Sequence, residues 1–463
     1  MGVLNAVRTW FSRKAGGEAQ SAEELRVAFR ARYHQFKLLL NANNKALEIM
    51  AEMEEALKGT WPFGMTFVRS RCTRVSTNVF QIAKHLNDLA PGKYEVLYHR
   101  FKDIQVKINP YIRPRSVSLE GPTVIPLQEV DKTMADQVGS KLANLGEIGN
   151  RIGLKVPRGF AVTAQGYEQF IKYSDLQAEI DRRIQSADMD RTDELYRLTA
   201  SLQHLIISAP LPRDLEGVII HHFRLLEKEV GEGARVAVRS SALGEDFPGT
   251  SFAGQYRSEL NVSADYVLQA YKEVVASKYS LPAMTYRLNR GIRDEDVAMC
   301  VGCMHMVDAV SGGVMYSRNP VNIRDDAVVI NAVWGLPKSV VDGSATADLF
   351  VISRGNPERI RRKDILFKDQ KLVCYPEEGV CRLDLTGDVG GLPSLTDDQA
   401  LELARLAVRL EAYYKTPQDI EWAIGEDENI TVLQCRPMQQ IGEGPKREDG
   451  KAGGRELGTV ILK

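Results

Sequence analysis

The sequence predicts an α+β protein in which a bundle of helices precedes a larger domain of mixed helices and strands. Three observations support this fold class. Apolar residues recur at helical spacing through the first hundred residues, a proline-rich stretch follows, and short β-branched runs then alternate with amphipathic segments. With 463 residues, the chain has room for more than one domain and for a large core.

The first hundred residues contain three helical patterns. In the first, apolar side chains recur in alternating steps of three and four residues, interrupted by Asn43 and Glu54. Its apolar members are Phe29, Tyr33, Phe36, Leu40, Leu47, Met50 and Leu57. A second pattern covers residues 68–89, and a third begins at Tyr94. We therefore expect a helical bundle or short coiled coil over residues 1–108, packed along this seam and able to join copies of the chain into a homo-oligomer.

Charge is divided unevenly along the chain. Residues 1–115 contain 19 Lys and Arg against 10 Asp and Glu, although the whole chain has a formal charge of −1. Such a basic region could serve nucleic acid, an acidic partner or the acidic remainder of the same chain. A solvated helix face explains the bias more simply, so we predict no nucleic-acid partner.

Neither a membrane segment nor a disulfide framework is predicted. No stretch approaches the roughly 20 apolar residues of a membrane helix, and the first residues lack the apolar core of a secretory signal. The six cysteines are scattered, which favours a cytoplasmic location without membrane attachment. The pair Cys300 and Cys303 lies in a pattern typical of a buried strand, so core packing is expected rather than zinc binding.

Proline and glycine mark the expected domain boundaries. Residues 109–123 contain several prolines and predict an extended linker. Residues 124–440 then form the mixed helix and strand domain. Residues 441–463 are polar and glycine-rich, and we expect them to be a linker toward a further domain.

Two segments contain residues suited to binding phosphate. Lys141 follows a Gly-Ser dipeptide at the expected start of a helix, where free backbone N–H groups and the lysine could meet an anion; an ordinary surface lysine is the alternative. Arg239 is expected at the end of a strand, before a glycine-containing loop with Ser251 and Gly254. The amides of this loop and the arginine fork could bind a polyphosphate. A hairpin with an ion-paired arginine is the alternative.

The segment PQDIEWAIGEDENITVLQCRP predicts two strands joined by an acidic turn. Alternation places Asp419 with Glu421 on one face, and Gln434 with Arg436 on one face. A register that opposes Glu421 to Gln434 also opposes Asp419 to Arg436. The carboxylate and amide oxygens would then suit Mg²⁺, which takes its other ligands from water and nucleotide phosphates. A solvent-facing hairpin is the alternative, and under both interpretations the opposite face packs on a core through Ile420, Trp422, Leu433 and Cys435.

Together these segments resemble the ATP-grasp domain shared by phosphoenolpyruvate synthase, pyruvate phosphate dikinase and rifampicin phosphotransferase. The resemblance runs from about Val124 to Met438 through VGSKLANLGEIG, VPRGFAVTAQGYEQF, VAVRSSALGEDFPGTSFAGQY, SGGVMYSRNP, VWGLPKSVVDG and QDIEWAI with LQCRP. It implies an ATP-grasp domain of two mixed α/β subdomains over residues 124–440, with ATP and Mg²⁺ as cofactors.

The resemblance also implies roles for individual residues. Lys141, Arg239 and Arg436 match residues that hold the ATP phosphates, and the first two are the expected catalytic groups. Glu421 and Gln434 match the magnesium ligands. The other expected ATP contacts are in the loop that covers the phosphates and in the strand that meets adenine: Ser251, Gly254, Met304 and Met306.

Family members transfer the β-phosphate of ATP to a histidine on a swivelling domain and release AMP. None of the seven histidines here lies in the small-residue motif of that histidine. The resemblance therefore implies an incomplete dikinase-type phosphotransferase whose acceptor is a histidine on a separate domain or subunit. A non-catalytic ATP sensor or partner-binding module is the alternative, favoured by departures from the family pattern at Met304, Asn331 and Pro337-Lys338.

Overall fold

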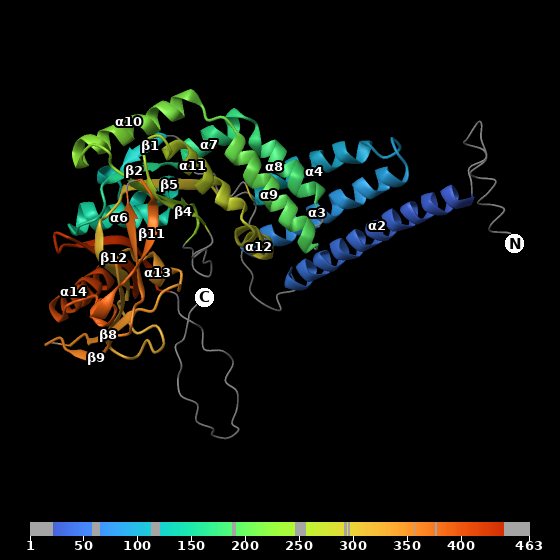
Figure 1. Cartoon of the computed structure of the whole chain (residues 1–463). Helices are drawn as coiled ribbons and strands as arrows, with labels where there is room; N and C mark the ends of the chain where they lie inside the picture. Colours follow the sequence, from blue (N-terminus) through green and yellow to red (C-terminus); the bar gives the residue numbers. More distant parts are fainter. Residues whose placement is uncertain are drawn as a thin grey trace, which may run out of the picture. The chain divides into compact units, whose positions relative to one another are not determined.

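The structure, a computed structural model, describes residues 22–57, 65–112, 121–187, 191–245, 256–290, 294, 297–355, 357–375 and 377–438. The chain divides into two compact units (Figure 1). The first comprises Met1–Arg115 with Leu288–Arg293, and the second comprises Ser116–Arg287 with Asp294–Lys463. A helical unit followed by a unit of helices and antiparallel sheets confirms the predicted α+β class. Among the described residues, no helix is both long and apolar enough to cross a membrane.

The first unit contains the three helices that the sequence predicted: α2 (Ala22–Leu57), α3 (Met65–Leu89) and α4 (Val96–Ile112). Helices α2 and α3 run antiparallel, and a hydrogen bond of 2.7 Å joins Gln35 to His85. Helix α4 continues through Pro110, so helical structure reaches into the region expected to be a linker from residue 109.

The predicted apolar stripe of α2 is not the face that packs within this unit. The side chains buried within the unit are Ala42, Ala46, Ile49 and Ala56, whereas the predicted apolar stripe from Phe29 to Leu57 is exposed. The two faces differ by a single residue along the helix. Small side chains let α3 approach α2 closely, which accounts for the choice of the alanine-rich face.

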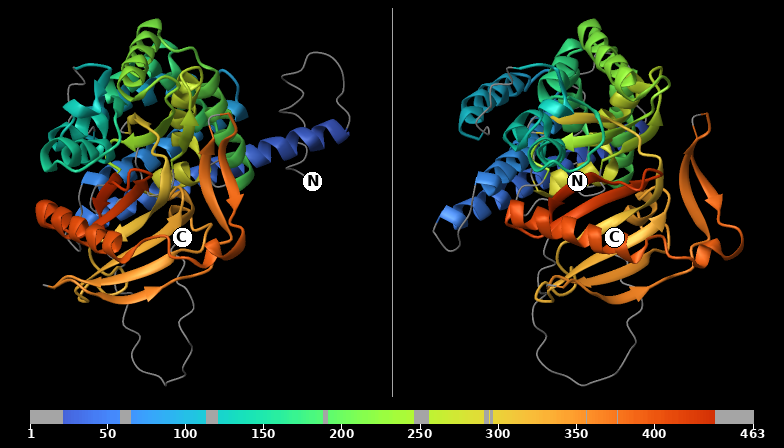
Figure 2. Two further views of the ribbon diagram at one scale, coloured as in Figure 1. Left: turned by 60° about the vertical axis from the view of Figure 1, so that its left-hand side comes forward. Right: turned by 90° about the vertical axis from the view of Figure 1, so that its left-hand side faces the viewer.

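A five-stranded antiparallel sheet forms the first part of the second unit (Figure 2). Its order is β1-β2-β5-β3-β4, with β1 (Val124–Pro126), β2 (Gly159–Val162), β3 (Val236–Ala242), β4 (Ser258–Val262) and β5 (Met299–His305). The helices of this region are α5 (Ala135–Val138), α6 (Ser140–Glu147), α7 (Ala164–Tyr173), α8 (Leu176–Ser186), α9 (Thr192–Ser208), α10 (Arg213–Val230), α11 (Val267–Ala276) and α12 (Leu281–Arg290). Short helical turns are η1 (Leu127–Glu129), η2 (Lys132–Met134), η3 (Ile148–Ile152) and η4 (Ser277–Tyr279). Strand β2 is buried at every position, as expected for a strand covered on both faces.

A six-stranded antiparallel sheet forms the second part of this unit. Its order is β13-β12-β6-β7-β8-β9, with β6 (Ala309–Tyr316), β7 (Ala327–Trp334), β8 (Asp348–Ser353), β9 (Ile360–Asp364), β12 (Gln418–Gly425) and β13 (Ile430–Pro437). The remaining elements are α13 (Lys338–Val341), the hairpin β10 (Gln370–Tyr375) and β11 (Gly379–Asp384), η6 (Gly387–Gly391) and α14 (Asp397–Tyr414). Helix α14 covers this sheet and begins with a capping box in which Thr396 and Gln399 satisfy each other's backbone N–H groups.

Helix α6 connects the cores of the two sheets. Its buried residues Leu142 and Leu145 belong to one apolar cluster with Ala161 of the first sheet and with Trp422 and Cys435 of the second. Asn144 also donates a hydrogen bond of 3.2 Å to the carbonyl of Cys435. The first turn of α6 is therefore fixed where the two sheets meet.

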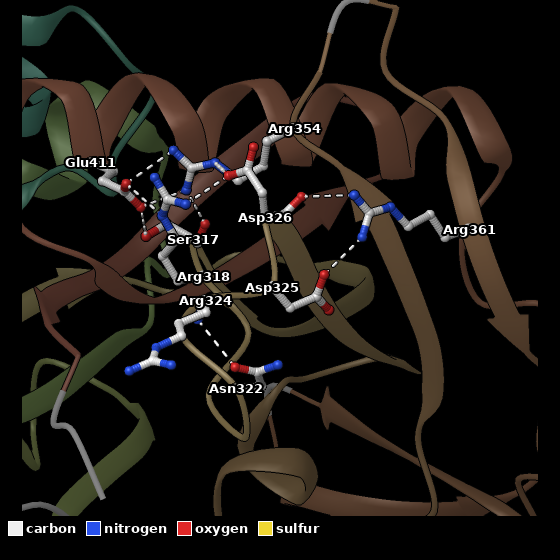
Figure 3. A network of polar contacts seen from close by, with 9 residues as sticks. All are labelled: Ser317, Arg318, Asn322, Arg324, Asp325, Asp326, Arg354, Arg361 and Glu411. Atoms are coloured by element: carbon white, nitrogen blue, oxygen red, sulfur yellow. Dashed lines mark hydrogen bonds and ion pairs between the residues drawn. The ribbon is translucent and has the colours of Figure 1, made fainter. Parts of the chain in front are cut away.

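A network of charged side chains fastens α14 to the second sheet (Figure 3). Arg354 donates two hydrogen bonds to Glu411, of 2.6 and 2.9 Å, and Arg318 donates a third of 3.0 Å. Ser317 donates to the same carboxylate at 2.6 Å. Burial raises the pKa of Glu411, but the bonds from Arg354, Ser317 and Arg318 outweigh it, so the pKa is lowered. Residues 317–320, the SRNP part of the motif SGGVMYSRNP, therefore have a structural role here.

Candidate functional site

The first turn of α6 places Lys141 beside β3. Gly139 precedes the helix at φ 78°, and a Cβ there would collide with the carbonyl oxygen of Ser241. The Leu142 amide donates to the Ser241 hydroxyl at 3.3 Å, which satisfies one of the free N–H groups at the helix start. Because glycine alone tolerates this close approach at positive φ, Gly139 fixes the position of Lys141 relative to β3.

Lys141 forms an ion pair with Glu245, whose carboxylate oxygen lies 2.6 Å from the lysine nitrogen. Glu245 is almost completely buried, and it also accepts a hydrogen bond from the Ala242 amide at 3.2 Å. The lysine is therefore no ordinary surface side chain. Glu245 was not predicted from the sequence, because nothing in the spacing of two residues so far apart signals their contact.

Arg239 joins the two sheets. It lies within β3, which continues to Ala242 and so extends past the predicted strand end. Its Nη2 donates to Glu421 Oε2 at 2.6 Å and to Gln434 Oε1 at 3.2 Å, and its Nη1 donates to the Leu433 carbonyl at 3.4 Å. The arginine is thus ion-paired, as the alternative interpretation expected, but its partners are the two predicted metal ligands.

The β12–β13 hairpin has the predicted register. Glu421 opposes Gln434, and Asp419 opposes Arg436. Arg436 donates two hydrogen bonds to Asp419, of 2.9 and 2.6 Å. The structure therefore brings Lys141, Arg239 and this hairpin together from three separate parts of the sequence.

One detail of the hairpin was predicted incorrectly. A β-bulge follows Glu421, so Trp422 opposes Val432 instead of Leu433. Val432 is fully buried in the core, whereas Leu433 is only partly buried. Simple alternation along β13 fails at this bulge, while Ile420 and Cys435 are buried as expected.

The positive and negative side chains of the site nearly neutralise one another, and they lie close enough to affect the pKa of Glu421. Burial alone raises the pKa of Glu421, but Arg239, Arg436 and Lys141 together hold it below its ordinary value. All three cations therefore act on this one carboxylate. A cluster of cations around a buried carboxylate at the meeting point of two sheets provides positive charge for phosphates and an anionic group for a metal ion.

The donor set fits Mg²⁺ when phosphates complete the coordination. The carboxylate of Glu421 and the amide oxygen of Gln434 both point at one cationic nitrogen, Nη2 of Arg239. Oxygens of this type are the ligands that Mg²⁺ prefers, and the ion usually combines one or two protein ligands with phosphates and water. Within the described ranges, no group of three or more His, Cys, Asp or Glu side chains is arranged to hold a metal.

The two methionines predicted to contact adenine lie in different clusters. Met304 is buried in the large core that also contains Leu142. Met306 instead packs with Ala237 and Leu336 in a small cluster beside the β10–β11 hairpin. Ser251 and Gly254 lie outside the described residues.

Cys300 and Cys303 are fully buried within β5, which confirms core packing. Burial raises the pKa of both thiols, to about 12 for Cys303.

Comparison with known proteins adds a family match. Residues 135–454 match the model of the pyruvate phosphate dikinase AMP/ATP-binding domain. This region includes Lys141, Arg239 and the β12–β13 hairpin.

Curated relatives are similar over the same part of the chain. Phosphoenolpyruvate synthase of Escherichia coli K12 is 35% identical over 369 residues, which cover 74% of this chain and 46% of the relative. Phosphoenolpyruvate synthase of Aeropyrum pernix is 35% identical over 349 residues, with 69% and 42% covered. Rifampicin phosphotransferase of Bacillus cereus is 31% identical over 329 residues, with 71% and 37% covered. The chain thus spans less than half the length of these relatives.

Proposed function

Because this chain belongs to the family of the pyruvate phosphate dikinase AMP/ATP-binding domain, we propose that it binds ATP with Mg²⁺ and transfers a phosphate to a histidine on a separate domain or subunit. The observation that carries the proposal is the convergence of Glu421 and Gln434 on Arg239, with Lys141 close enough to affect the same carboxylate. A cytoplasmic location remains our prediction.

In the proposed complex, the metal ion and the ATP phosphates would replace the present ion-pair partners of these side chains. Arg239 is held by the oxygens that we assign to Mg²⁺. Held there, Mg²⁺ would supply positive charge that neutralises the phosphates. Glu421 and Gln434 would hold the metal, and the guanidinium of Arg239, which now donates to them, would donate to phosphate oxygens. Lys141 and Arg436 would exchange their carboxylate partners for phosphates in the same way.

The contribution of the protein to this transfer is position and charge. Phosphoryl transfer requires little covalent chemistry from the enzyme, and positive groups fixed around the phosphates stabilise the transition state. Arg239 and Lys141 are fixed by β3 and by the rigid start of α6, so the groups are largely in place before the nucleotide binds. We therefore assign both residues a catalytic role.

For adenine, the structure favours Met306 over Met304. Met306 lies in the small cluster with Ala237 and Leu336, whereas Met304 is packed within the large core. We propose that the base binds against the Met306 cluster. Ser251 and Gly254 keep their predicted role in covering the phosphates.

Formation of AMP tests the transfer, because the β-phosphate passes to the histidine, the γ-phosphate is released to water as inorganic phosphate, and AMP remains. The chain is incubated with ATP, Mg²⁺ and a candidate histidine domain, and nucleotides are separated by chromatography. We expect AMP only when the histidine domain is present, and none with Arg239→Ala. Arg151→Ala is the matched control, because Arg151 is exposed and pairs with Asp131 away from the site.

A non-catalytic ATP-binding module is the second candidate. It is favoured by the pairing of Lys141 with the buried Glu245, since this carboxylate competes with phosphates for the lysine. Tight ATP binding without AMP formation, with every histidine domain tested, would support this function over transfer.

A further inference from the structure

Helix α2 has two apolar faces, and one of them is already used within its own unit. Ala42, Ala46, Ile49 and Ala56 are buried against α3. An ion pair of 2.8 Å between Arg71 of α3 and Glu52 of α2 holds these two helices antiparallel, as does the hydrogen bond between Gln35 and His85. This face is therefore not available to a partner.

The second face carries large apolar side chains that are exposed. We call it the outer stripe: Phe29, Tyr33, Phe36, Leu40, Leu47, Met50 and Leu57. Their spacing alternates between three and four residues, with Asn43 and Glu54 at the two intervening positions. The outer stripe is displaced by one residue, or about 100°, from the buried face. An apolar heptad pattern sustained over about four heptads is typical of a coiled-coil seam.

The exposure of the outer stripe is large enough to require a partner. Leu47 is 56% exposed and Leu57 is 76% exposed, and Phe29 and Tyr33 stack on each other with ring centroids 6.2 Å apart. Single exposed apolar side chains need no explanation, but a contiguous row along several helical turns marks an interaction surface.

The charges along α2 indicate the occupant. Arg26, Arg30 and Lys37 are exposed in the N-terminal half, whereas Glu48 and Glu54 are exposed in the C-terminal half. Two parallel copies would bring like charges together. Two antiparallel copies would place the basic half of each helix along the acidic half of the other, so the helix is complementary to itself only in this orientation.

The apolar positions fit the same antiparallel register. When Phe36 lies opposite Leu47 of a second copy, Tyr33 lies opposite Met50. In this register Arg26 and Arg30 lie beside Glu54 of the second copy. Each contact occurs twice, because a two-fold axis relates the helices.

We propose that the outer stripe of α2 is a homodimerisation surface that pairs antiparallel with the outer stripe of a second copy of this chain. The surface belongs to the helical unit, so the proposal does not depend on nucleotide binding. It assigns a binding role to the part of the chain outside the matched family domain.

Sedimentation equilibrium of the full chain over a range of concentrations tests the surface. We expect a species of twice 51.7 kDa for the wild type. Leu47→Glu should weaken dimerisation by at least about tenfold, because a carboxylate would be buried in an apolar seam. Val27→Glu is the matched control, since Val27 is 61% exposed on α2 but outside the outer stripe. A monomeric wild type, or equal dimerisation constants for the two variants, would overturn the proposal.

A charge exchange tests the orientation. Arg30→Glu and Glu54→Arg should each weaken the dimer, and the double variant should recover the wild-type dimerisation constant because the attraction is restored with reversed sign. Far-UV circular dichroism checks that each variant keeps its helical content. A double variant no better than the single ones would overturn the antiparallel arrangement.

Discussion

Arg239 of β3 donates to Glu421 of β12 across 2.6 Å, and this bond connects one antiparallel sheet to the other. The same guanidinium reaches Gln434, which opposes Glu421 in the hairpin. The residues proposed to hold phosphate and those proposed to hold metal are thus in contact before any ligand is present. The proposed function depends on the exchange of these contacts.

Arg239→Ala should weaken ATP binding by about tenfold to a hundredfold, because charge-assisted hydrogen bonds contribute about 1.5–3 kcal/mol. Calorimetric titration with ATP and Mg²⁺ measures the change. Arg151→Ala should bind like the wild type. A loss of less than about twofold for Arg239→Ala would mean that the arginine links the two sheets but does not bind phosphate.

Lys141→Met should lower the free energy of unfolding by about 3–5 kcal/mol, because it leaves the buried carboxylate of Glu245 without its cation. Adding Glu245→Gln should recover part of this loss, while ATP binding stays weak in both variants. Urea denaturation and titration with ATP separate the two effects. Lys155→Met, which breaks an exposed pair with Asp427, is the control. Full recovery of ATP binding in the double variant would contradict the phosphate role of Lys141.

Glu411 should make stability depend on pH in the acid range. Its folded pKa lies below the ordinary value of 4.5, so its stabilising effect is complete above pH 4.5 and is lost as the pH falls through the folded pKa. Glu411→Gln should lower the free energy of unfolding by about 1–3 kcal/mol at neutral pH and reduce the acid-dependent loss. Thermal unfolding between about pH 3 and pH 7, the range in which carboxylates titrate, measures the loss of stability at neutral pH and the acid-dependent loss.

The control for this prediction is Glu402→Gln, on an exposed position of the same helix. Its stability should follow the wild type at every pH. Parallel pH profiles for Glu411→Gln and the wild type would show that the Arg354 and Arg318 contacts do not set the acid sensitivity.

The sequence was sufficient to predict the hairpin, because side-chain alternation and a single turn determine which residues face one another. Glu421 therefore meets Gln434 as predicted. The bulge beyond Glu421 has no sequence signal, so the burial of Leu433 was predicted incorrectly. The Lys141–Glu245 pair was missed for a different reason: it joins segments that only the packing of α6 on both sheets brings together.

Helix α2 shows the limit of periodicity. Its two faces, one with Ala46 and one with Leu47, both follow the three-and-four spacing and differ by one residue. Hydrophobicity favoured the face with the larger side chains, whereas packing within the unit used the face with the smaller ones. The existence of the helix was predictable, but the choice between the faces depended on how closely α3 could approach.

Calorimetric titration with ATP, in the presence and absence of Mg²⁺, tests whether Glu421 holds the metal when wild type, Glu421→Ala and Glu428→Ala are compared. Glu428 is exposed in the turn of the same hairpin and serves as the matched control. We predict Mg²⁺-dependent ATP binding by the wild type and by Glu428→Ala, and loss of that dependence in Glu421→Ala. Absence of binding in the wild type, or equal effects of the two substitutions, would contradict the proposed ATP and metal site.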